Sequence, residues 1–317
     1  MWYLLYIKYI LKSFFQFYLH KDYYLLVNQN LKHGIIFGLI SAFFFAIMSI
    51  FVKILGPNLP VSMLIFFRFS LSLLFLIPFL LRDPEFEFKL IPSHPKMYFM
   101  RIFCPMIALA IIFYSIPRFK IVDVLLLQNS APLFVPLLAW LIAGVSTPKM
   151  VKIGIVIGFI GVAITLNPTS NLLDDIYSLI PLAAGLMIAI TVVYIRLIGK
   201  VNTPKQIFFY YFFFTTLISG IWVIFDWKTP VGTEQWILII GISLSGLIYQ
   251  VFSTMSYLKA PVRIMSPLVF MQTVFGGILD WFILDNIPGI STLIGAILVI
   301  TGGVITVYFG LHLVKQN

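Results

Sequence analysis

Apolar residues fall into long runs separated by short polar segments, and the sequence contains ten such runs. Their limits are 35–55, 61–81, 97–117, 122–144, 149–167, 176–197, 205–226, 235–257, 264–284 and 289–312. Each run has roughly the 20 residues that a helix needs to cross a hydrocarbon core of about 30 Å. Backbone polar groups cannot stay unpaired in lipid, so each run is expected to be an α-helix. The predicted fold class is an all-α integral membrane protein with ten transmembrane helices.

The first 34 residues have a different pattern, in which aromatic residues are mixed with lysines. Lys8 and Lys12 lie in the middle of the apolar stretch from Trp2 to Leu19. A signal peptide would carry its charge first and end in a small-residue cleavage site. We therefore predict that residues 1–34 are an amphipathic segment lying on the membrane surface. An eleventh span over residues 2–19 is the alternative.

The second half of the sequence repeats the first half at an offset of about 140 residues. The matching segments are 38–56 with 181–199, 65–69 with 207–211, 132–140 with 273–281, and 153–164 with 294–305. Each predicted repeat, 35–167 and 176–312, holds five spans. Five is an odd number, so the second repeat must insert upside down relative to the first. Inverted repeats of this kind are typical of secondary transporters that work by alternating access.

Composition supports a membrane protein and excludes a soluble one. Hydrophobic residues make up 61% of the 317 residues, the mean hydropathy is +1.05 and charged residues make up only 10%, whereas soluble domains have about 25% charged residues. The net charge of +10 does not indicate nucleic-acid binding, because the basic residues stand singly between apolar runs. The expected surroundings of the chain are a lipid bilayer.

The basic residues also predict an orientation. With Lys53, Arg68 and Arg101 set aside, fifteen of the 21 Lys and Arg residues lie on the side of the N-terminus, and only Arg118, Lys120 and Lys228 lie on the opposite side. Basic residues accumulate on the cytoplasmic side of membrane proteins. Both termini are therefore expected in the cytoplasm, with the protein in a bacterial inner membrane.

Charged residues inside the runs are candidate substrate-binding residues, because a charge within a membrane is costly. Arg68 and Asp280 are expected at a similar depth near the outer surface, as an ion pair or as two walls of one polar cavity. Asp280 is also the candidate for proton coupling. Lys53, at the outer end of the first run, is a further candidate, and snorkelling to the surface is its alternative explanation. Arg101, near the start of the third run, is expected to anchor the cytoplasmic edge.

Uncharged polar residues cluster at corresponding places in the fourth and ninth runs. Gln128 and Asn129 precede Pro132, and Gln272 precedes a pair of glycines. Helices broken or weakened at matched positions of two repeats indicate a central binding site, and hydrogen bonding between helices is the alternative. Aromatic residues predicted near the same site are Tyr114, Tyr249 and Trp281.

Glycines line the fifth and tenth runs, and we expect these faces to pack as scaffold. They are Gly154, Gly158, Gly161, Gly295, Gly302 and Gly303. A homodimer through them is the alternative. The four histidines lack ligand spacing, so no metal site is expected. No phosphate loop of the GxxxxGK[ST] kind occurs, so a nucleotide-driven pump is not predicted. No cofactor is predicted either.

The repeated segments resemble the EamA domain of the drug/metabolite transporter superfamily. The resemblance rests on FFRF at 66–69, on APLFVPLLAWLIAG at 131–144 and its second-half equivalent at 271–288, and on the glycine-spaced fifth and tenth runs. It implies a carrier of small metabolites with ten helices. Members of the superfamily carry amino acids, nucleotide-like metabolites, sugars or drugs, and some import S-adenosylmethionine. Val145 and Asn286 stand where the family often has Glu.

These patterns predict a secondary active transporter of a small polar metabolite, such as an amino acid or a related compound. The resemblance adds an importer or exchanger of S-adenosylmethionine or a nucleotide-like metabolite as an alternative. A channel is the alternative from another class, although the sequence has no long loop that could form a selectivity filter. An enzyme is not expected, because the runs hold no pair of acids and no histidine motif.

Overall fold

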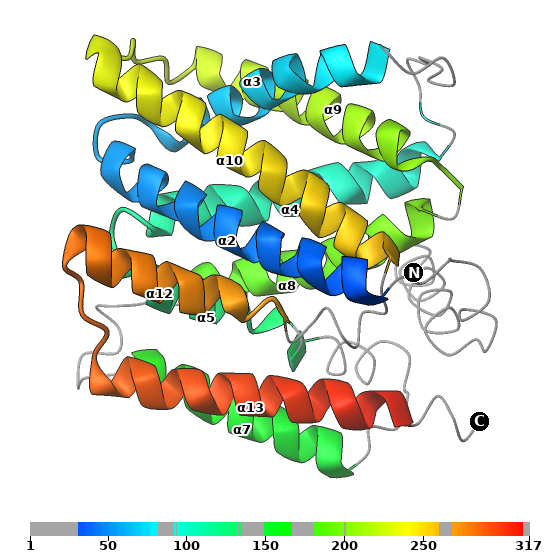
Figure 1. Ribbon diagram of the computed structural model, residues 1–317, viewed down its shortest axis with the longest axis vertical. Helices are drawn as coiled ribbons and strands as arrows, with labels where there is room; N and C mark the ends of the chain where they lie inside the picture. The colour runs from blue at the N-terminus through cyan, green and yellow to red at the C-terminus, as the bar shows by residue number, and fades with distance from the viewer. Residues whose placement is uncertain are drawn as a thin grey trace, which may run out of the picture.

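The computed structural model describes residues 31–81, 92, 94–131, 133–134, 149–166, 180–199, 201–259 and 268–312, and this part of the chain contains helices and no strands. The helices lie side by side as one bundle (Figure 1). Their bounds are α2 Leu31–Leu55, α3 Val61–Leu81, α4 Pro95–Ser115, α5 Ile121–Gln128, α7 Lys149–Leu166, α8 Ile180–Ile198, α9 Pro204–Ile224, α10 Gly232–Lys259, α12 Met271–Leu284 and α13 Ile290–His312.

The predicted spans agree with these helices over most of their lengths. Within the described residues, five helices are long and apolar enough to cross a membrane: Lys32–Leu55, Val61–Leu80, Pro95–Ser115, Pro204–Ile224 and Gly232–Lys259. Helix α5 ends at Gln128 in a turn, helical residues follow at 131, 133 and 134, and residues 135–144 of this apolar run lie outside the described residues. The predicted surface segment 1–34 lies outside the described residues, except that its last four residues belong to α2.

Local sequence signals explain several helix ends. Thr203 caps α9 in a reciprocal capping box with Gln206, and Pro204 occupies the first helical turn, where it needs no hydrogen-bond acceptor. Asp285 ends α12 in the left-handed conformation with φ 54°. The backbone N–H of Asp285 donates to the carbonyl of Asp280, which satisfies one of the carbonyls left open at the end of a helix.

The main helix contacts join the first part of the chain to the second. Helix α2 packs along α10, α4 along α8, α3 along α9, α5 along α12 and α7 along α13. Figure 1 shows α7 and α13 together at the lower edge of the bundle, apart from the helices that surround the centre. Every one of these pairs combines a helix that ends by residue 166 with a helix that begins at residue 180 or later.

Glycines bring α7 and α13 into backbone contact. A Cβ atom at Gly302 would lie 2.5 Å from the carbonyl oxygen of Gly154 and 2.5 Å from the backbone nitrogen of Gly158. Gly161 approaches the backbone of α13 in the same way, near Gly295. Gly303 instead faces the ring of Phe270. These contacts agree with the expectation that the glycine faces are scaffold.

Candidate functional site

A cavity of about 840 Å³, including its open mouth, lies between the helices at the centre of the bundle. Its walls come from both halves of the chain, with α2, α3, α4 and α5 from the first and α8, α9, α10 and α12 from the second. On α2 the lining residues run from Gly38 to Phe45, and on α10 from Tyr249 to Tyr257. The cavity therefore lies toward the end of the bundle where α2 begins and α10 ends.

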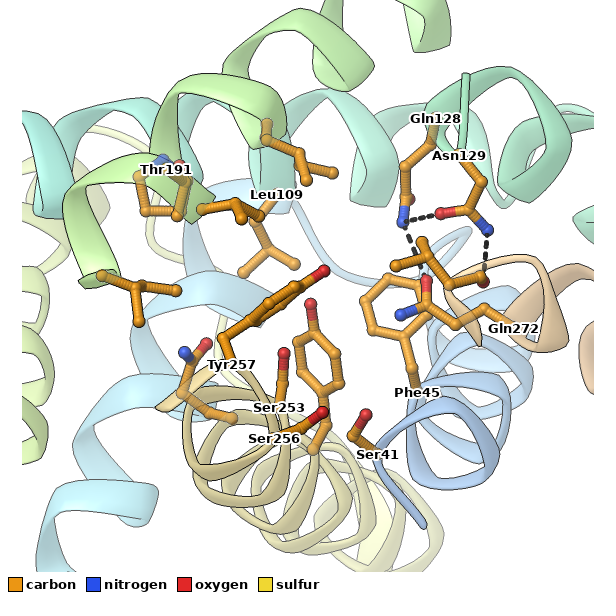
Figure 2. A pocket seen from close by; sticks show the side chains of 18 of the residues that line it. Ser41, Phe45, Leu109, Gln128, Asn129, Thr191, Ser253, Ser256, Tyr257 and Gln272 are labelled. Atoms are coloured by element: carbon orange, nitrogen blue, oxygen red, sulfur yellow. Dashed lines mark hydrogen bonds between the residues drawn. The ribbon is translucent and has the colours of Figure 1, made fainter. Parts of the chain in front are cut away.

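One wall of the cavity is a pair of interrupted helices. Helix α5 ends at Gln128 in a turn, and α12 begins at Met271 directly after a turn at 269–270. Gln128 donates from Nε2 to Oε1 of Gln272 at 3.2 Å, and Asn129 donates from Nδ2 to Oγ1 of Thr273 at 3.2 Å. Figure 2 shows the side chains of Gln128 and Gln272 pointing toward each other at the edge of the cavity. The predicted breaks at matched positions are present within the described residues.

A glycine in α8 lets this broken segment sit close to the neighbouring helix. A Cβ atom at Gly185 would lie 2.8 Å from the carbonyl oxygen of Gln128. That oxygen belongs to backbone and cannot move aside as a flexible side chain would. Gly185 thus fixes the depth at which Gln128 and Asn129 face the cavity.

Two arginines line the cavity and are almost fully buried. The side chain of Arg68 is 1% exposed and that of Arg101 is 0% exposed. Arg101 Nη2 lies 3.5 Å from the Thr254 hydroxyl oxygen. Nε and Nη1 of both arginines have no hydrogen-bond partner in the described part of the chain. Unpaired donors on a buried cation are costly, which makes these groups ready to bind an acceptor.

Aromatic rings hold the two guanidinium groups in place. The Cζ atom of Arg101 lies 4.1 Å from the ring centre of Tyr211, and that of Arg68 lies 4.3 Å from the ring centre of Phe69. Tyr211 and Tyr249 are electrostatic neighbours of both arginines and also line the cavity. Cations over aromatic faces are attracted by the ring electrons, so this packing stabilises the charges without neutralising them.

A second polar cluster lies at the opposite end of the bundle. Asp280 is fully buried and accepts hydrogen bonds from the backbone N–H of Ile121 at 3.0 Å and from Nδ2 of Asn286 at 3.0 Å. Thr292 of α13 donates to Asp123 of α5 at 2.9 Å. These bonds tie α5 to α12 and α13 where the cavity does not reach.

The structure brings together five of the nine residues predicted to bind substrate, namely Arg68, Gln128, Asn129, Tyr249 and Gln272, which all line the cavity. Lys53 and Asp280 lie at the other end, where Lys53 donates to the Phe119 carbonyl. Tyr114 stacks under Arg118. Trp281 is 47% exposed and stacks on Phe282.

Two sequence-based interpretations are wrong. Asp280 does not pair with Arg68 or share its cavity, because its carboxylate is taken up by Ile121 and Asn286. Arg101 does not anchor the membrane edge, because α4 begins at Pro95 and carries Arg101 nearly two turns into the bundle, against Tyr211. Tyr211 was not singled out. Tyr211 directly follows Tyr210, which aligns with Arg68 in the repeat, and this position in the sequence indicates that it lies near the site.

Comparison with known proteins gives a consistent family. The model of the EamA-like transporter family matches residues 32–167 and again 176–308. An uncharacterized transporter of Helicobacter pylori is 22% identical over 288 residues, covering 87% of this chain and 96% of the relative. An S-adenosylmethionine uptake transporter of Rickettsia prowazekii is 25% identical over 287 residues, covering 89% and 96%.

Two further matches extend the comparison. A riboflavin transporter of Brucella anthropi is 24% identical over 248 residues, covering 77% of this chain and 86% of the relative. A solved crystal structure of a protein superposes with a TM-score of 0.60 at 15% identity, over 86% of this chain and 96% of the other. At that identity the structural match supports the fold alone.

Proposed function

Because the chain belongs to the EamA-like transporter family, we propose that it is a secondary active transporter of a small polar metabolite, such as an amino acid or a related compound, in the bacterial inner membrane. The substrate reaches a central site alternately from the two sides of the membrane. The observation that carries this proposal is the cavity, whose walls come from both predicted repeats and combine buried arginines, amides and tyrosines. Such a mixture is typical of a binding site for a polar small molecule.

The helix contacts support an inverted repeat as the basis of alternating access. In the predicted correspondence α8 is the counterpart of α2, and α10 is the counterpart of α4. The contact between α2 and α10 then has its equivalent in the contact between α8 and α4. The pairs α3 with α9, α5 with α12 and α7 with α13 each join a helix to its own counterpart. Exchange of the two repeats thus maps these five pairs onto one another, which supports two corresponding units.

The position of the cavity supports an inward-facing state. With both termini in the cytoplasm, as the basic residues predict, the cavity lies in the cytoplasmic half of the bundle. The contacts of Asp280 with Ile121 and of Asp123 with Thr292 then lie at the outer end. These contacts would close the outer path while the inner one is open, and they would have to separate when the carrier reverses.

Import or exchange of S-adenosylmethionine is the second candidate. It is supported by relatives named as S-adenosylmethionine uptake transporters in several Rickettsia species, including Rickettsia prowazekii and Rickettsia felis. The tyrosines around the cavity offer aromatic faces that could stack on a purine. A channel is the alternative from another class.

Counterflow in proteoliposomes tests the carrier. Liposomes with purified protein are loaded with one unlabelled metabolite, and entry of the same labelled metabolite is followed. A carrier gives saturable, transient accumulation of label above the outside concentration, whereas a channel only equilibrates it. Protein-free liposomes are the background, and Arg118→Gln, at an exposed arginine remote from the cavity, is the matched control. Equilibration without overshoot for every metabolite tested would rule out the carrier.

A further inference from the structure

We propose that the transported metabolite is a net anion, and that Arg68 and Arg101 bind its carboxylate or phosphate group together. This inference rests on the proposed transport function, because it concerns the same cavity, and it narrows the substrate to a chemical class. It follows from three features of the cavity: its charge, the surroundings of the two arginines, and an unpaired acceptor on Gln128.

The described part of the cavity carries two positive charges and no negative one. The acidic residues in this part of the chain are Asp123, Asp226, Glu234, Asp280 and Asp285, and none of them lines the cavity. Within the described residues, the two arginines contact aromatic rings and the Thr254 hydroxyl, and none of these partners is a carboxylate. A bound anion would complete the pairing that the side chains leave open.

The two guanidinium groups border the same cavity and share aromatic neighbours. Arg68 comes from α3 and Arg101 from α4, yet both border the cavity and both have Tyr211 and Tyr249 as neighbours. Each keeps Nε and Nη1 without a partner among the described residues. A guanidinium N–H without a partner makes a strong, charge-assisted hydrogen bond to a carboxylate or phosphate oxygen. Because ring stacking fixes both planes, little side-chain freedom would be lost on binding.

The wall formed by α5 and α12 offers a hydrogen-bond acceptor. Gln128 donates to Gln272 through Nε2, but its Oε1 atom is buried without a partner in the described residues. An N–H or O–H group of the metabolite would satisfy this oxygen. The site thus fits a molecule with an anionic group at one end and a hydrogen-bond donor at the other, such as an acidic amino acid, a hydroxy acid or a nucleoside monophosphate.

The same features disfavour a cation. S-adenosylmethionine carries a sulfonium and an ammonium group against one carboxylate, so its net charge is positive. Two buried arginines without a lining carboxylate would repel the sulfonium, and like charges in a membrane interior are costly. The charge of the cavity therefore favours an anionic metabolite over S-adenosylmethionine.

The test combines binding and flux on the full-length protein. Melting temperature is measured in a neutral detergent with glutamate, malate, adenosine monophosphate and inorganic phosphate as anions, and with leucine, riboflavin and S-adenosylmethionine as non-anions. We expect at least one anion, and none of the non-anions, to raise the melting temperature. The carboxylates and the phosphates show which of the two groups is bound. Stabilisation by S-adenosylmethionine or leucine but by no anion would overturn the inference.

Substitution of the arginines locates the site. Arg68→Gln and Arg101→Gln should each raise the half-saturating concentration of the stabilising anion about thirtyfold or more. Arg118→Gln should leave that concentration unchanged. Each shift is read against the variant's own melting temperature without ligand. If a glutamine variant does not fold, Arg68→Lys and Arg101→Lys keep the charge but lose the fork, and weaker anion binding is again expected. Unchanged binding in the arginine variants would contradict the proposal.

Counterflow separates this inference from the carrier function. Arginine-dependent anion binding without counterflow would support the anion site and reject the carrier. Counterflow of S-adenosylmethionine that does not depend on either arginine would support the carrier and reject the anion site.

Discussion

The carboxylate of Asp280 in α12 accepts a hydrogen bond from the backbone N–H of Ile121, the first residue of α5, at 3.0 Å across 159 positions of sequence. The second oxygen of Asp280 accepts from Asn286. The first N–H groups of a helix have no partner within the helix, and a carboxylate there is favoured by the helix dipole. Asp280 therefore acts as an N-terminal cap supplied by the other half of the chain.

We expect Asp280→Ala to destabilise the protein by about 1–3 kcal/mol, because it leaves the buried N–H of Ile121 without an acceptor. Asp280→Asn keeps an oxygen at the same place and should cost less. The measurement is the melting temperature of the two variants in detergent. Equal loss in both would mean that the charge, and not the hydrogen bond, is what stabilises this contact.

A separate prediction concerns proton coupling through the same residue. If transport is driven by protons that bind Asp280, Asp280→Asn should abolish uptake driven by a pH gradient and leave exchange intact. The check is uptake into proteoliposomes with and without an imposed pH gradient, next to counterflow at equal pH. Unchanged pH-driven uptake would reject coupling at Asp280 and leave the capping role.

The apolar runs predict the helical class of the described residues, and the polar positions predict part of the cavity lining. Apolar runs fix the helices because lipid permits few other structures, and polar residues beside a broken helix, such as Gln128, had to face inward. The direction in which a side chain points around the helix axis is harder to predict from the sequence. Arg101 and Asp280 were assigned from their depth, but depth does not say which neighbour a side chain meets. Arg101 turned toward Tyr211, and Asp280 toward the start of α5.

The amide pair between the two halves gives a third prediction. Gln128→Ala and Gln272→Ala each remove one partner of a buried hydrogen bond, and each should lower stability by about 1 kcal/mol or more. The double variant should lose less than the sum, because the second change removes an already unpaired group. Melting temperatures of the two single variants and the double variant measure this coupling. Strict additivity would mean that the amides do not interact in the membrane protein.

The same two amides border the cavity, so their effect on transport can be separated from stability. Gln128 lines the cavity, and Gln128→Ala also removes its unpaired Oε1 atom. We expect it to raise the half-saturation concentration for counterflow more than Gln272→Ala does. Equal half-saturation in the two variants, at equal amounts of folded protein, would contradict a direct role of Gln128.

The last prediction concerns the contact between α7 and α13. Gly302→Ala would place a Cβ atom 2.5 Å from the carbonyl oxygen of Gly154 and from the nitrogen of Gly158. All of these atoms are backbone, so the two helices must move apart, and overpacking of this kind costs about 1–3 kcal/mol. Gly289→Ala is the matched control, because its Cβ atom would meet nothing within 4 Å. A lower melting temperature for Gly302→Ala alone is expected. If a dimer interface and not this internal contact used the glycine, the variant would instead run as a smaller species in size-exclusion chromatography with an unchanged melting temperature.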